Sequence, residues 1–573
     1  MVLALLALVL GLSIGLTQAK KSHSPPKRPA QVQAPAPAQI LGPKIDLGYT
    51  TVQGLSYPGG ISQWLGVRYA QPPVGKLRFA EPQNVTANST LQLVTQRGAH
   101  CIGTRNSPHD PLLSAGANED CLNLDIYAPS SVTAESALPV YFFIQGGGFN
   151  SAYPTQNAST LVEASNGQIM VVSINYRVSV YGFLASSEVH DRGSFNNGLK
   201  DQRLALQWVQ EHIAKFGGDP KHVVIGGDSA GAGSVTMQLA AYGGRNDKLF
   251  VGSIAESQSF GAIRTISESQ YQYDALVNRT NCASSKDTLD CLRGLDMITL
   301  QAQNIRDRFP HTNEDPLFAY NPTLDNDFIR DYTLKLYSSG KFLKLPAIYG
   351  DVSNEGTIFV PKSAGASTNT SNAWLQAQFP ELNDTQLSTL QSLYPPEDQS
   401  RYPKLSSSIG KFWRSTTTAY GDLRYVCPGF LVNNATAHYA SKNPSAGNWN
   451  YHYNVTDQGN VNDGFGVPHI AEQSAIWASP NPASYRTTNL PIIPLMQGYW
   501  ISFIRSLDPN KFRAPGAPVW DDWGKEDKTG GNRLLVQNPG PHGDISTTVM
   551  ENVDPDLRVK CATLLSWGVA IKQ

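Results

Sequence analysis

Long apolar runs and clustered charge are both scarce in this chain of 573 residues. After the N-terminal segment, no apolar stretch approaches the about 18 residues of a membrane-spanning helix, so we expect no stable membrane anchor in the mature chain. Lys and Arg number 45 against 46 Asp and Glu, and beyond the N-terminal tail they form no basic cluster, which argues against a nucleic-acid partner. His, Cys, Asp and Glu nowhere show the spacing of metal ligands, so we expect no metal and no cofactor.

The N-terminus has the composition of a targeting segment. Residues 1–19 read MVLALLALVLGLSIGLTQA and end in a small-x-small site, which predicts a secretory signal peptide cleaved near Ala19; the run lacks an early Lys or Arg, and an uncleaved anchor is the alternative. Residues 20–43 are rich in Pro, Ala, Gln and Lys and are interpreted as a linker or pro-segment. Because no composition break follows residue 44, we expect residues 44–573 to form one large α/β domain of a secreted, extracellular protein.

Sequons and cysteines agree with secretion. The six cysteines permit three disulfides, although their spacing alone selects no pairing. Eight N-x-S/T sequons are candidates for glycosylation, namely Asn84, Asn88, Asn157, Asn278, Asn369, Asn383, Asn434 and Asn454.

Strand and helix patterns alternate along the chain. Leu138–Gln145 and Gln168–Arg177 are apolar runs typical of buried strands. Between Leu204 and Phe216, apolar residues recur at spacings of three and four, which predicts a helix. This order of strand, helix and strand is typical of a doubly wound, mostly parallel sheet.

The segment 216–233, FGGDPKHVVIGGDSAGAG, carries the most informative motif. Its Val-Val-Ile run suits a strand buried on both faces, and Gly227 to Gly231 then has the form G-x-S-x-G. Small residues at both ends of this motif permit a sharp turn from strand to helix, which lifts the hydroxyl of Ser229 above the sheet. The N–H of Ala230 would then lie at a helix N-terminus, where it can face a developing negative charge.

With its upstream Phe-Gly-Gly, this segment resembles the active-serine signature of the type-B carboxylesterase/lipase family, cholinesterase-like α/β-hydrolases that include fungal lipases. Residues 67–79 (VRYAQPPVGKLRF) and 119–129 (EDCLNLDIYAP) resemble two further blocks; in the second, Asn123 replaces the usual residue and is interpreted as a surface variation. The resemblance, to the fungal secreted branch, implies an α/β-hydrolase fold: a large, mostly parallel central sheet flanked by helices, with a small N-terminal β-sheet.

A serine hydroxyl needs a base to take its proton and an acid to orient that base. The segment 350–356 (GDVSNEG) resembles the family block that carries the acid, which implies Glu355, with Asp351 as the alternative. The segment 464–472 (GFGVPHIAE) resembles the histidine loop, which implies His469 as the base. His452, inside a strand pattern, is expected to be structural, and His542, in the segment PGPHGD, is expected to lie in an exposed turn.

The resemblance also implies an oxyanion hole and a disulfide pattern. Gly146-Gly147-Gly148-Phe149 follows a strand and resembles the family's G-G-G-F loop, which places the hole at the N–H groups of Gly147, Gly148 and Ala230. The implied disulfides are Cys101–Cys121, Cys282–Cys291 and Cys427–Cys561.

The residues between the first two cysteines bear on the substrate. Only Ile102, Leu112 and Leu113 are strongly apolar there, too few for an amphipathic lid, and no Trp is present to hold a choline group. We therefore expect a serine carboxylesterase that acts on small, soluble esters through an acyl-enzyme. A lipase or sterol esterase on aggregated substrates and a non-catalytic, cholinesterase-like adhesion protein are the alternatives.

Overall fold

The computed structural model describes residues 40–57, 59–151, 154–396, 409–440, 447–525 and 531–573, which belong to one compact unit. The predicted signal peptide and most of the segment 20–43 lie outside these residues. Within the described chain, no helix combines the length and apolar character needed to cross a membrane.

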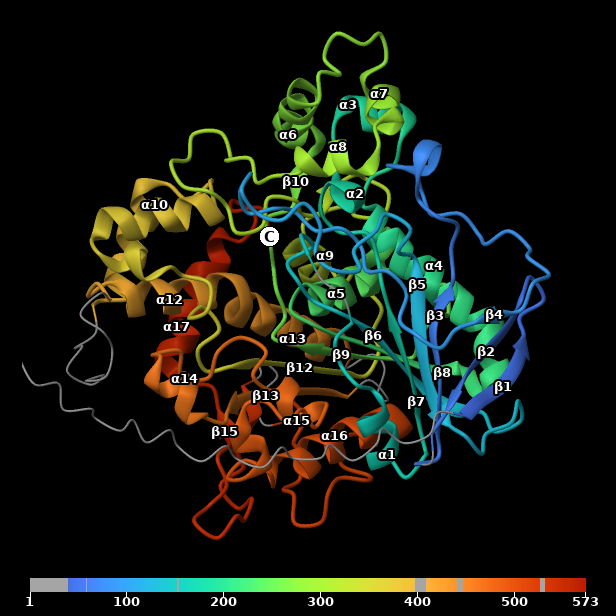
Figure 1. Cartoon of the computed structure of the whole chain (residues 1–573). Coiled ribbons are helices and arrows are strands. Elements are labelled where there is room, and N and C mark those ends of the chain that lie inside the picture. Colours follow the sequence, from blue (N-terminus) through green and yellow to red (C-terminus); the bar gives the residue numbers. More distant parts are fainter. Residues whose placement is uncertain (1–39, 58, 152–153, 397–408, 441–446, 526–530) are drawn as a thin grey trace, which may run out of the picture. The chain divides into compact units, whose positions relative to one another are not determined.

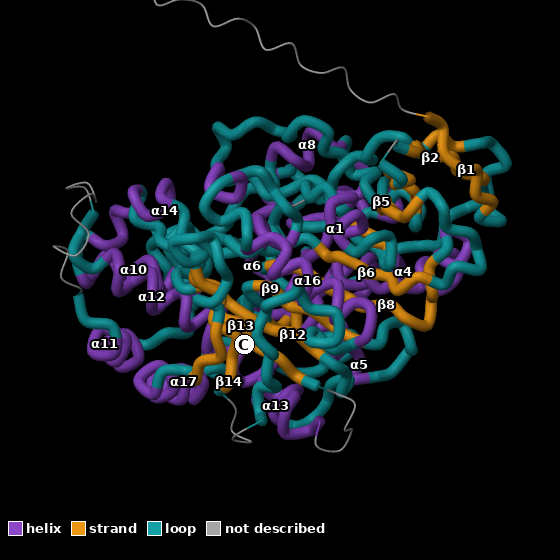
Figure 2. Tube along the Cα trace, turned by 90° about the horizontal axis from the view of Figure 1, so that it is seen from below, coloured by secondary structure: helices purple, strands orange, loops and turns teal. Residues whose placement is uncertain are grey.

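A 13-stranded sheet forms the framework (Figures 1 and 2). Its central strands are parallel and follow the order β7 (Met170–Ile174), β6 (Leu138–Ile144), β8 (Gly218–Asp228), β9 (Gly252–Glu256), β12 (Ala347–Val352), β13 (Asn448–Asn454) and β14 (Asn532–Gln537). Alternate residues of β6 enter different cores: Phe142 packs in one cluster, whereas Tyr141 and Phe143 pack in another. Because both faces are covered, β6 and β7 are nearly continuous apolar runs.

Helices cover the two faces of the sheet (Figure 1). On one face, α4 (Asn197–His212) and α5 (Ala230–Gly244) contribute their apolar side chains to the same core as Phe142. On the other, α1 (Ser159–Ala164) and α16 (Ile492–Ser506) pack with Tyr141 and Phe143. The large sheet flanked by helices confirms the expected α/β-hydrolase fold.

The predicted small N-terminal β-sheet is an edge of the main sheet. Here β1 (Ile40–Asp46), β2 (Thr51–Ser56) and β3 (Ile61–Arg68) extend the main sheet as an antiparallel edge, with β4 (Gln92–Leu93) paired to β2. The reason is that β3 pairs along its length with β5 (Asn123–Pro129), which in turn pairs with β7. The strand β1 begins four residues before the expected start of the domain. At the opposite edge, β15 (Val549–Asn552) pairs antiparallel with β14.

A third core lies among the helices that follow β12. It joins α10 (Thr368–Gln378), α11 (Asp384–Leu393), α12 (Trp413–Gly421), the π-helical turn Asp422–Val426, α13 (Cys427–Ala440) and α17 (Pro555–Trp567). The remaining described helices and strands are α2 (Ser179–Phe183), α3 (Ser187–Arg192), β10 (Arg264–Thr265), α6 (Ile266–Arg279), α7 (Thr288–Gly294), α8 (Met297–Ala302), β11 (Thr323–Leu324), α9 (Thr333–Ser338), α14 (Gln458–Asn462) and α15 (Gln473–Ile476), apart from short 3-10 turns.

Three disulfides cross-link the chain, and they join the pairs that the resemblance implied. They are Cys101–Cys121, Cys282–Cys291 and Cys427–Cys561, with Cα–Cα distances of 5.0, 5.7 and 4.9 Å. The third ties the start of α13 to α17, which closes the longest loop of the three and should restrict the unfolded chain most.

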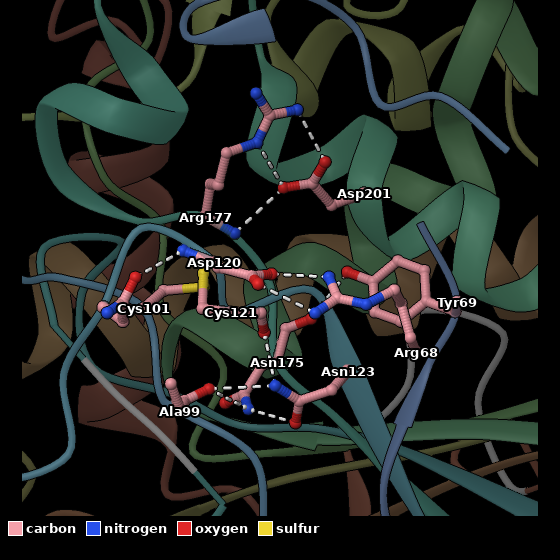
Figure 3. The surroundings of a disulfide bond; sticks show 11 residues. Arg68, Tyr69, Ala99, Cys101, Asp120, Cys121, Asn123, Asn175, Arg177 and Asp201 are labelled. Atoms are coloured by element: carbon pink, nitrogen blue, oxygen red, sulfur yellow. Dashed lines mark hydrogen bonds and ion pairs between the residues drawn. A yellow bond between two sulfur atoms is a disulfide. The ribbon is translucent and has the colours of Figure 1, made fainter. Parts of the chain in front are cut away.

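The surroundings of the first disulfide correct the interpretation of Asn123 as a surface variation (Figure 3). Asn123 is 8% exposed, and its amide group donates to the carbonyl oxygens of Ala99 and Cys121 at 2.9 and 3.0 Å. Its Oδ1 accepts from Asn175 at 2.9 Å. The amide therefore satisfies buried polar groups beside Cys121.

Candidate active site

Ser229 lies at the turn between β8 and α5 in a strained conformation, with φ 54° and ψ −121°. Its N–H donates to the carbonyl oxygen of Glu256 at 2.9 Å, and its own carbonyl oxygen accepts from Gly233 at 2.9 Å. The neighbouring backbone leaves no room for larger side chains: a Cβ at Gly231 would lie 2.0 Å from the carbonyl oxygen of Ile144. The strained turn is thus held by both adjacent strands, as a sharp strand-to-helix turn requires.

His469 and Glu355 form a buried pair. Nδ1 of His469 is hydrogen-bonded to Oε2 of Glu355, and the two residues are 5% and 2% exposed. Oε1 of Glu355 accepts from the N–H of Val352 at 2.9 Å, which fixes the carboxyl group. Nε2 of His469 is buried and has no hydrogen-bond partner among the described residues, so it is the ring nitrogen open to a reacting proton.

The loops that carry the pair are fastened to each other. The N–H of Asn354 donates to the carbonyl oxygen of Val467 at 3.0 Å, and the N–H of Val467 donates to Oδ1 of Asn354 at 2.9 Å. Gly466 has φ 67°, and a Cβ there would lie 2.1 Å from Oδ1 of Asn354. The close approach of the two loops therefore depends on a glycine beside the histidine segment.

Two consecutive residues join the histidine loop to the serine turn. The carbonyl oxygen of Glu256 accepts from the N–H of Ser229 at 2.9 Å. Next to it, the hydroxyl of Ser257 accepts from the N–H of Ile470 at 3.3 Å. The end of β9 thus connects both segments, although Ser229 and His469 are 240 positions apart in the chain.

The glycine loop after β6 lies against the same turn. The N–H of Gly146 donates to Oδ1 of Asp228 at 2.9 Å, and a Cβ at Gly146 would lie 2.8 Å from Cβ of Ser229. The N–H groups of Gly147, Gly148 and Ala230 donate no hydrogen bond to any described residue. Three free donors therefore adjoin the serine turn, an arrangement suited to an oxyanion.

Aromatic side chains surround these groups. The rings of Phe359 and Tyr425 lie 5.0 and 4.5 Å from the ring of His469, measured between centroids. Phe318 covers the glycine loop, since a Cβ at Gly148 would lie 2.0 Å from its ring. The walls around the serine turn are thus largely apolar, as in most small-molecule sites.

Burial disfavours charge on the histidine pair. It lowers the pKa of His469, an effect that the nearby carboxyl groups of Glu472 and Asp228 partly offset. It also raises the pKa of Glu355, which the N–H of Val352 acts to lower. A neutral imidazole at neutral pH is the form that can accept a proton, and the attraction of Glu355 then stabilises the imidazolium.

The structure separates the alternatives left open by the sequence. His469 contacts Glu355 and not Asp351, whose Oδ1 lies 3.8 Å from Nη1 of Arg533. His452 lies within β13, where Nδ1 is 2.9 Å from Oε1 of Glu551. The structural interpretation of His452 therefore agrees with its contacts, and His542 is exposed in a turn.

Two buried groups beneath the pair were not predicted. Glu472 is fully buried, and its Oε1 accepts from the hydroxyls of Tyr451 and Ser257 at 2.8 and 2.9 Å. Burial raises the pKa of Glu472 to about 7, and the nearby Glu355 raises it further. Glu472 belongs to the histidine motif and could have been found there, whereas Ser257 carries no sequence signal.

The sequons fall into two groups. Asn434 is half-buried, with its Oδ1 accepting from the indole of Trp523 at 2.8 Å, and Asn454 is half-buried, accepting from Ser353 at 2.8 Å. The other six are exposed, namely Asn84, Asn88, Asn157, Asn278, Asn369 and Asn383.

Comparison with known proteins identifies the family. Residues 42–537 match the sequence profile described as the carboxylesterase family. The chain belongs to the carboxylesterase family. A solved structure titled Aspergillus niger EstA superimposes on it with a TM-score of 0.86 and 37% sequence identity, covering 93% of this chain and 99% of EstA. Membership of this family, together with fungal lipase relatives, supports a carboxylic ester hydrolase.

Two curated fungal relatives of this carboxylesterase are named lipases. Secreted lipase 4 of Gibberella zeae is 30% identical over 520 residues, which cover 86% of this chain and 89% of the relative. Lipase 1 of Geotrichum candidum is 32% identical over 447 residues, which cover 70% and 78%. The names of these relatives do not decide between an esterase and a lipase, so the residues of the site have to.

Proposed function

We propose that this member of the carboxylesterase family is a secreted serine carboxylesterase that hydrolyses soluble carboxylic esters through an acyl-enzyme. The observation that carries the proposal is the buried His469–Glu355 pair, whose Nε2 is free and whose loop is joined to the strained turn of Ser229. Three unengaged N–H groups adjoin that turn. Nucleophile, base, orienting acid and oxyanion donors are the complete set that acyl transfer requires.

The reaction follows from these groups. The hydroxyl of Ser229 attacks the ester carbonyl carbon while Nε2 of His469 takes its proton. The carbonyl oxygen becomes an oxyanion and accepts hydrogen bonds from the N–H groups of Gly147, Gly148 and Ala230. Each such donor stabilises the transition state by about 3 to 4 kcal/mol. His469 then passes its proton to the departing alkoxide, leaving the acyl group on Ser229. A water molecule, which loses a proton to His469, then bonds to the acyl carbon. The bond from that carbon to Oγ of Ser229 breaks, the acid leaves, and His469 returns the proton to Oγ.

The loop between Cys101 and Cys121 supports soluble substrates. It contains no helix, and Ile102 is 2% exposed, so the loop presents little apolar surface beyond Leu112. Arg105 fastens it: Nη1 donates to the carbonyl oxygen of Ala302 at 2.9 Å, and Nη2 donates to that of Asp110 at 2.7 Å. A lid that opens at lipid surfaces needs a wide apolar face and freedom to move, and this loop offers neither.

A lipase is the second candidate, since relatives at 30 to 32% identity carry that name. Rates on p-nitrophenyl esters measured below and above their solubility limit separate the two. An esterase shows simple saturation through the limit, whereas a jump in rate above it would replace our proposal with the lipase.

Secretion and glycosylation belong to the same proposal. Three disulfides suit an oxidising compartment, and relatives from Gibberella zeae and Botryotinia fuckeliana are named secreted lipases. The six exposed sequons are open to solvent, whereas Asn434 and Asn454 are half-buried. We expect peptide mapping of the secreted protein to find glycans among the six and none at the two.

Replacement of the nucleophile tests the function. Ser229→Ala should lower kcat on p-nitrophenyl butyrate by several orders of magnitude, because it removes the hydroxyl that forms the proposed acyl-enzyme. The matched control is Ser392→Ala, which removes an exposed hydroxyl of α11. If Ser229→Ala retains near-normal turnover, the proposed mechanism is wrong.

A further inference from the structure

Arg424 is a buried cation without an acidic partner. It lies in the π-helical turn Asp422–Val426 and is 3% exposed. Nε donates to the hydroxyl of Ser259 at 3.0 Å, and the guanidinium stacks 4.8 Å from the ring centroid of Phe318. Nη2 is buried without a hydrogen bond, and no described carboxylate lies within ion-pair distance. Unpaired buried cations are costly, and single π-helical turns are frequent at functional sites.

The neighbours of Arg424 belong to the site described above. The N–H of Ser259 donates to the carbonyl oxygen of Ser229 at 3.2 Å. Phe318 packs against the oxyanion loop at Gly148, and the residue after Arg424, Tyr425, packs on the ring of His469. The guanidinium is also close enough to His469 to lower the pKa of its imidazole. Arg424 therefore adjoins the nucleophile, the oxyanion donors and the base.

A second unpaired polar atom lies near Gly261, as Nη2 does. Oδ1 of Asn321 is buried and has no hydrogen-bond partner in the described chain. Its amide nitrogen donates to the carbonyl oxygen of Phe318 at 3.0 Å, which fixes the orientation, because a flipped amide would set two oxygens against each other. Both atoms are close to Gly261: a Cβ there would be 3.2 Å from Nη2 of Arg424 and 2.6 Å from Oδ1 of Asn321.

We propose that Arg424 and Asn321 form a subsite for a hydroxyl group of the substrate, so that the preferred esters carry a hydroxylated aromatic group. A hydroxyl accepts a hydrogen bond from Nη2 and donates one to Oδ1, and so satisfies both atoms at once. A carboxylate satisfies Nη2 but sets a negative oxygen against Oδ1. The rings of Phe318 and Phe359, which pack edge to face with their centroids 6.1 Å apart, provide an aromatic wall for the rest of the group.

The inference rests on the proposed esterase function, and the probes are chosen to separate the two. The acyl arm compares methyl 3-phenylpropanoate with its para-hydroxy and para-carboxylate derivatives. The alcohol arm compares 2-phenylethyl acetate with 2-(4-hydroxyphenyl)ethyl acetate. The wild type should hydrolyse the hydroxylated ester of one arm with a kcat/KM about 10- to 100-fold above that of its unsubstituted partner, as expected for a hydrogen bond to a charged donor. The arm that shows the preference identifies the half of the ester that occupies the subsite.

Variants assign that preference to the two side chains. Arg424→Met should lower the hydroxyl-to-unsubstituted ratio about 10-fold or more, and Asn321→Val should lower it several-fold. Gly261→Ala, which places a methyl group against both polar atoms, should lower it as well. The matched control is Arg505→Met: Arg505 stacks 3.8 Å from the ring centroid of Phe512, next to Ile504, whose carbonyl oxygen contacts His222 in β8, seven residues before Ser229. This control removes an arginine–aromatic stack away from the serine turn, and the ratio should stay unchanged.

A ligand that does not react gives an independent measurement. Binding of 4-(4-hydroxyphenyl)butan-2-one and 4-phenylbutan-2-one, ketone analogues of the acyl-arm esters, is compared by calorimetry in the wild type and the variants. Tighter binding of the hydroxylated ketone, lost in Arg424→Met and Asn321→Val, supports the subsite even where turnover is slow.

Three outcomes overturn the subsite. They are equal kcat/KM values in both arms together with equal ketone affinities, a preference for the para-carboxylate ester that Asn321→Val increases, and a hydroxyl preference that survives Arg424→Met. If the unsubstituted esters are hydrolysed in each case, the esterase function stands while the subsite fails.

Discussion

Replacement of Glu355 by Gln tests how the histidine is oriented. The carboxyl group uses both oxygens: Oε1 accepts from Val352 at 2.9 Å and Oε2 pairs with Nδ1 of His469. In Glu355→Gln, the amide oxygen must accept the hydrogen bond from the N–H of Val352, because an NH2 group in that place would set two donors against each other. The NH2 group then faces Nδ1, which has to accept, so the imidazole proton moves to Nε2. Nε2 of His469 then carries a proton and cannot act as the base, although the side chain at position 355 keeps its shape.

The expected loss is about 10⁴-fold in kcat, the size seen where an orienting carboxylate becomes an amide and the wrong tautomer results. Stopped-flow measurement of p-nitrophenol release from p-nitrophenyl butyrate gives kcat, and thermal unfolding verifies that the variant is folded. Asp351→Asn is the control at the alternative acid, and its kcat should stay within about tenfold of the wild type. If kcat of Glu355→Gln stays within tenfold of the wild-type value, Glu355 is not the acid that orients His469. If Asp351→Asn loses more kcat than Glu355→Gln, Asp351 is that acid instead.

Three further predictions concern pH and stability. The acid limb of kcat/KM should have its midpoint below the ordinary histidine pKa of about 6.5, because burial lowers the pKa of His469 and activity requires the neutral ring; a midpoint above that value contradicts the assignment. Asp201→Asn should lower the free energy of unfolding in urea by about 3 to 5 kcal/mol, because it breaks a buried pair in which Oδ1 lies 2.7 Å from Nη2 of Arg177. The exposed Asp191→Asn is its control, and equal effects of the two changes would contradict the reasoning. The melting temperature should be higher at pH 5 than at pH 7.5. Burial raises the pKa of several carboxyl groups in the folded state above their unfolded value of about 4, so between these two values the folded state binds more protons than the unfolded state. The free energy of unfolding therefore falls as the pH rises through that interval. The buried histidine opposes this trend below pH 6.5, but the carboxyls outnumber it; a lower melting temperature at pH 5 contradicts the prediction. The buried carboxyl groups whose folded-state pKa is raised to about 6 to 7 are those of Asp125, Asp228, Asp351, Asp422 and Glu472.

Local patterns predicted the elements around the serine well. The apolar run before Ser229 lies in β8, and the small residues after it form the start of α5. Both were predictable because a strand buried on two faces and a tight strand-to-helix turn each have a clear sequence pattern. The helix expected from Leu204 begins earlier, at Asn197, because its first turns bury polar side chains such as Asp201 that break the apolar pattern.

Features that depend on distant contacts were not predictable. The N-terminal strands join the main sheet because β3 finds β5, a pairing that neither strand encodes alone. Asn123 is buried because its amide meets Ala99 and Asn175, which are remote in sequence. Arg424 and Asn321 belong to no motif, and only the folded chain brings their unpaired atoms to Gly261.

The central claim is that Ser229 carries the acyl group during turnover. Acid quenching of the enzyme during hydrolysis of p-nitrophenyl butyrate, followed by peptide mass spectrometry, tests it directly. The account predicts a butyryl adduct on the peptide that contains Ser229, absent from Ser229→Ala. A butyryl group on another residue, or turnover without any adduct on that peptide, would contradict it.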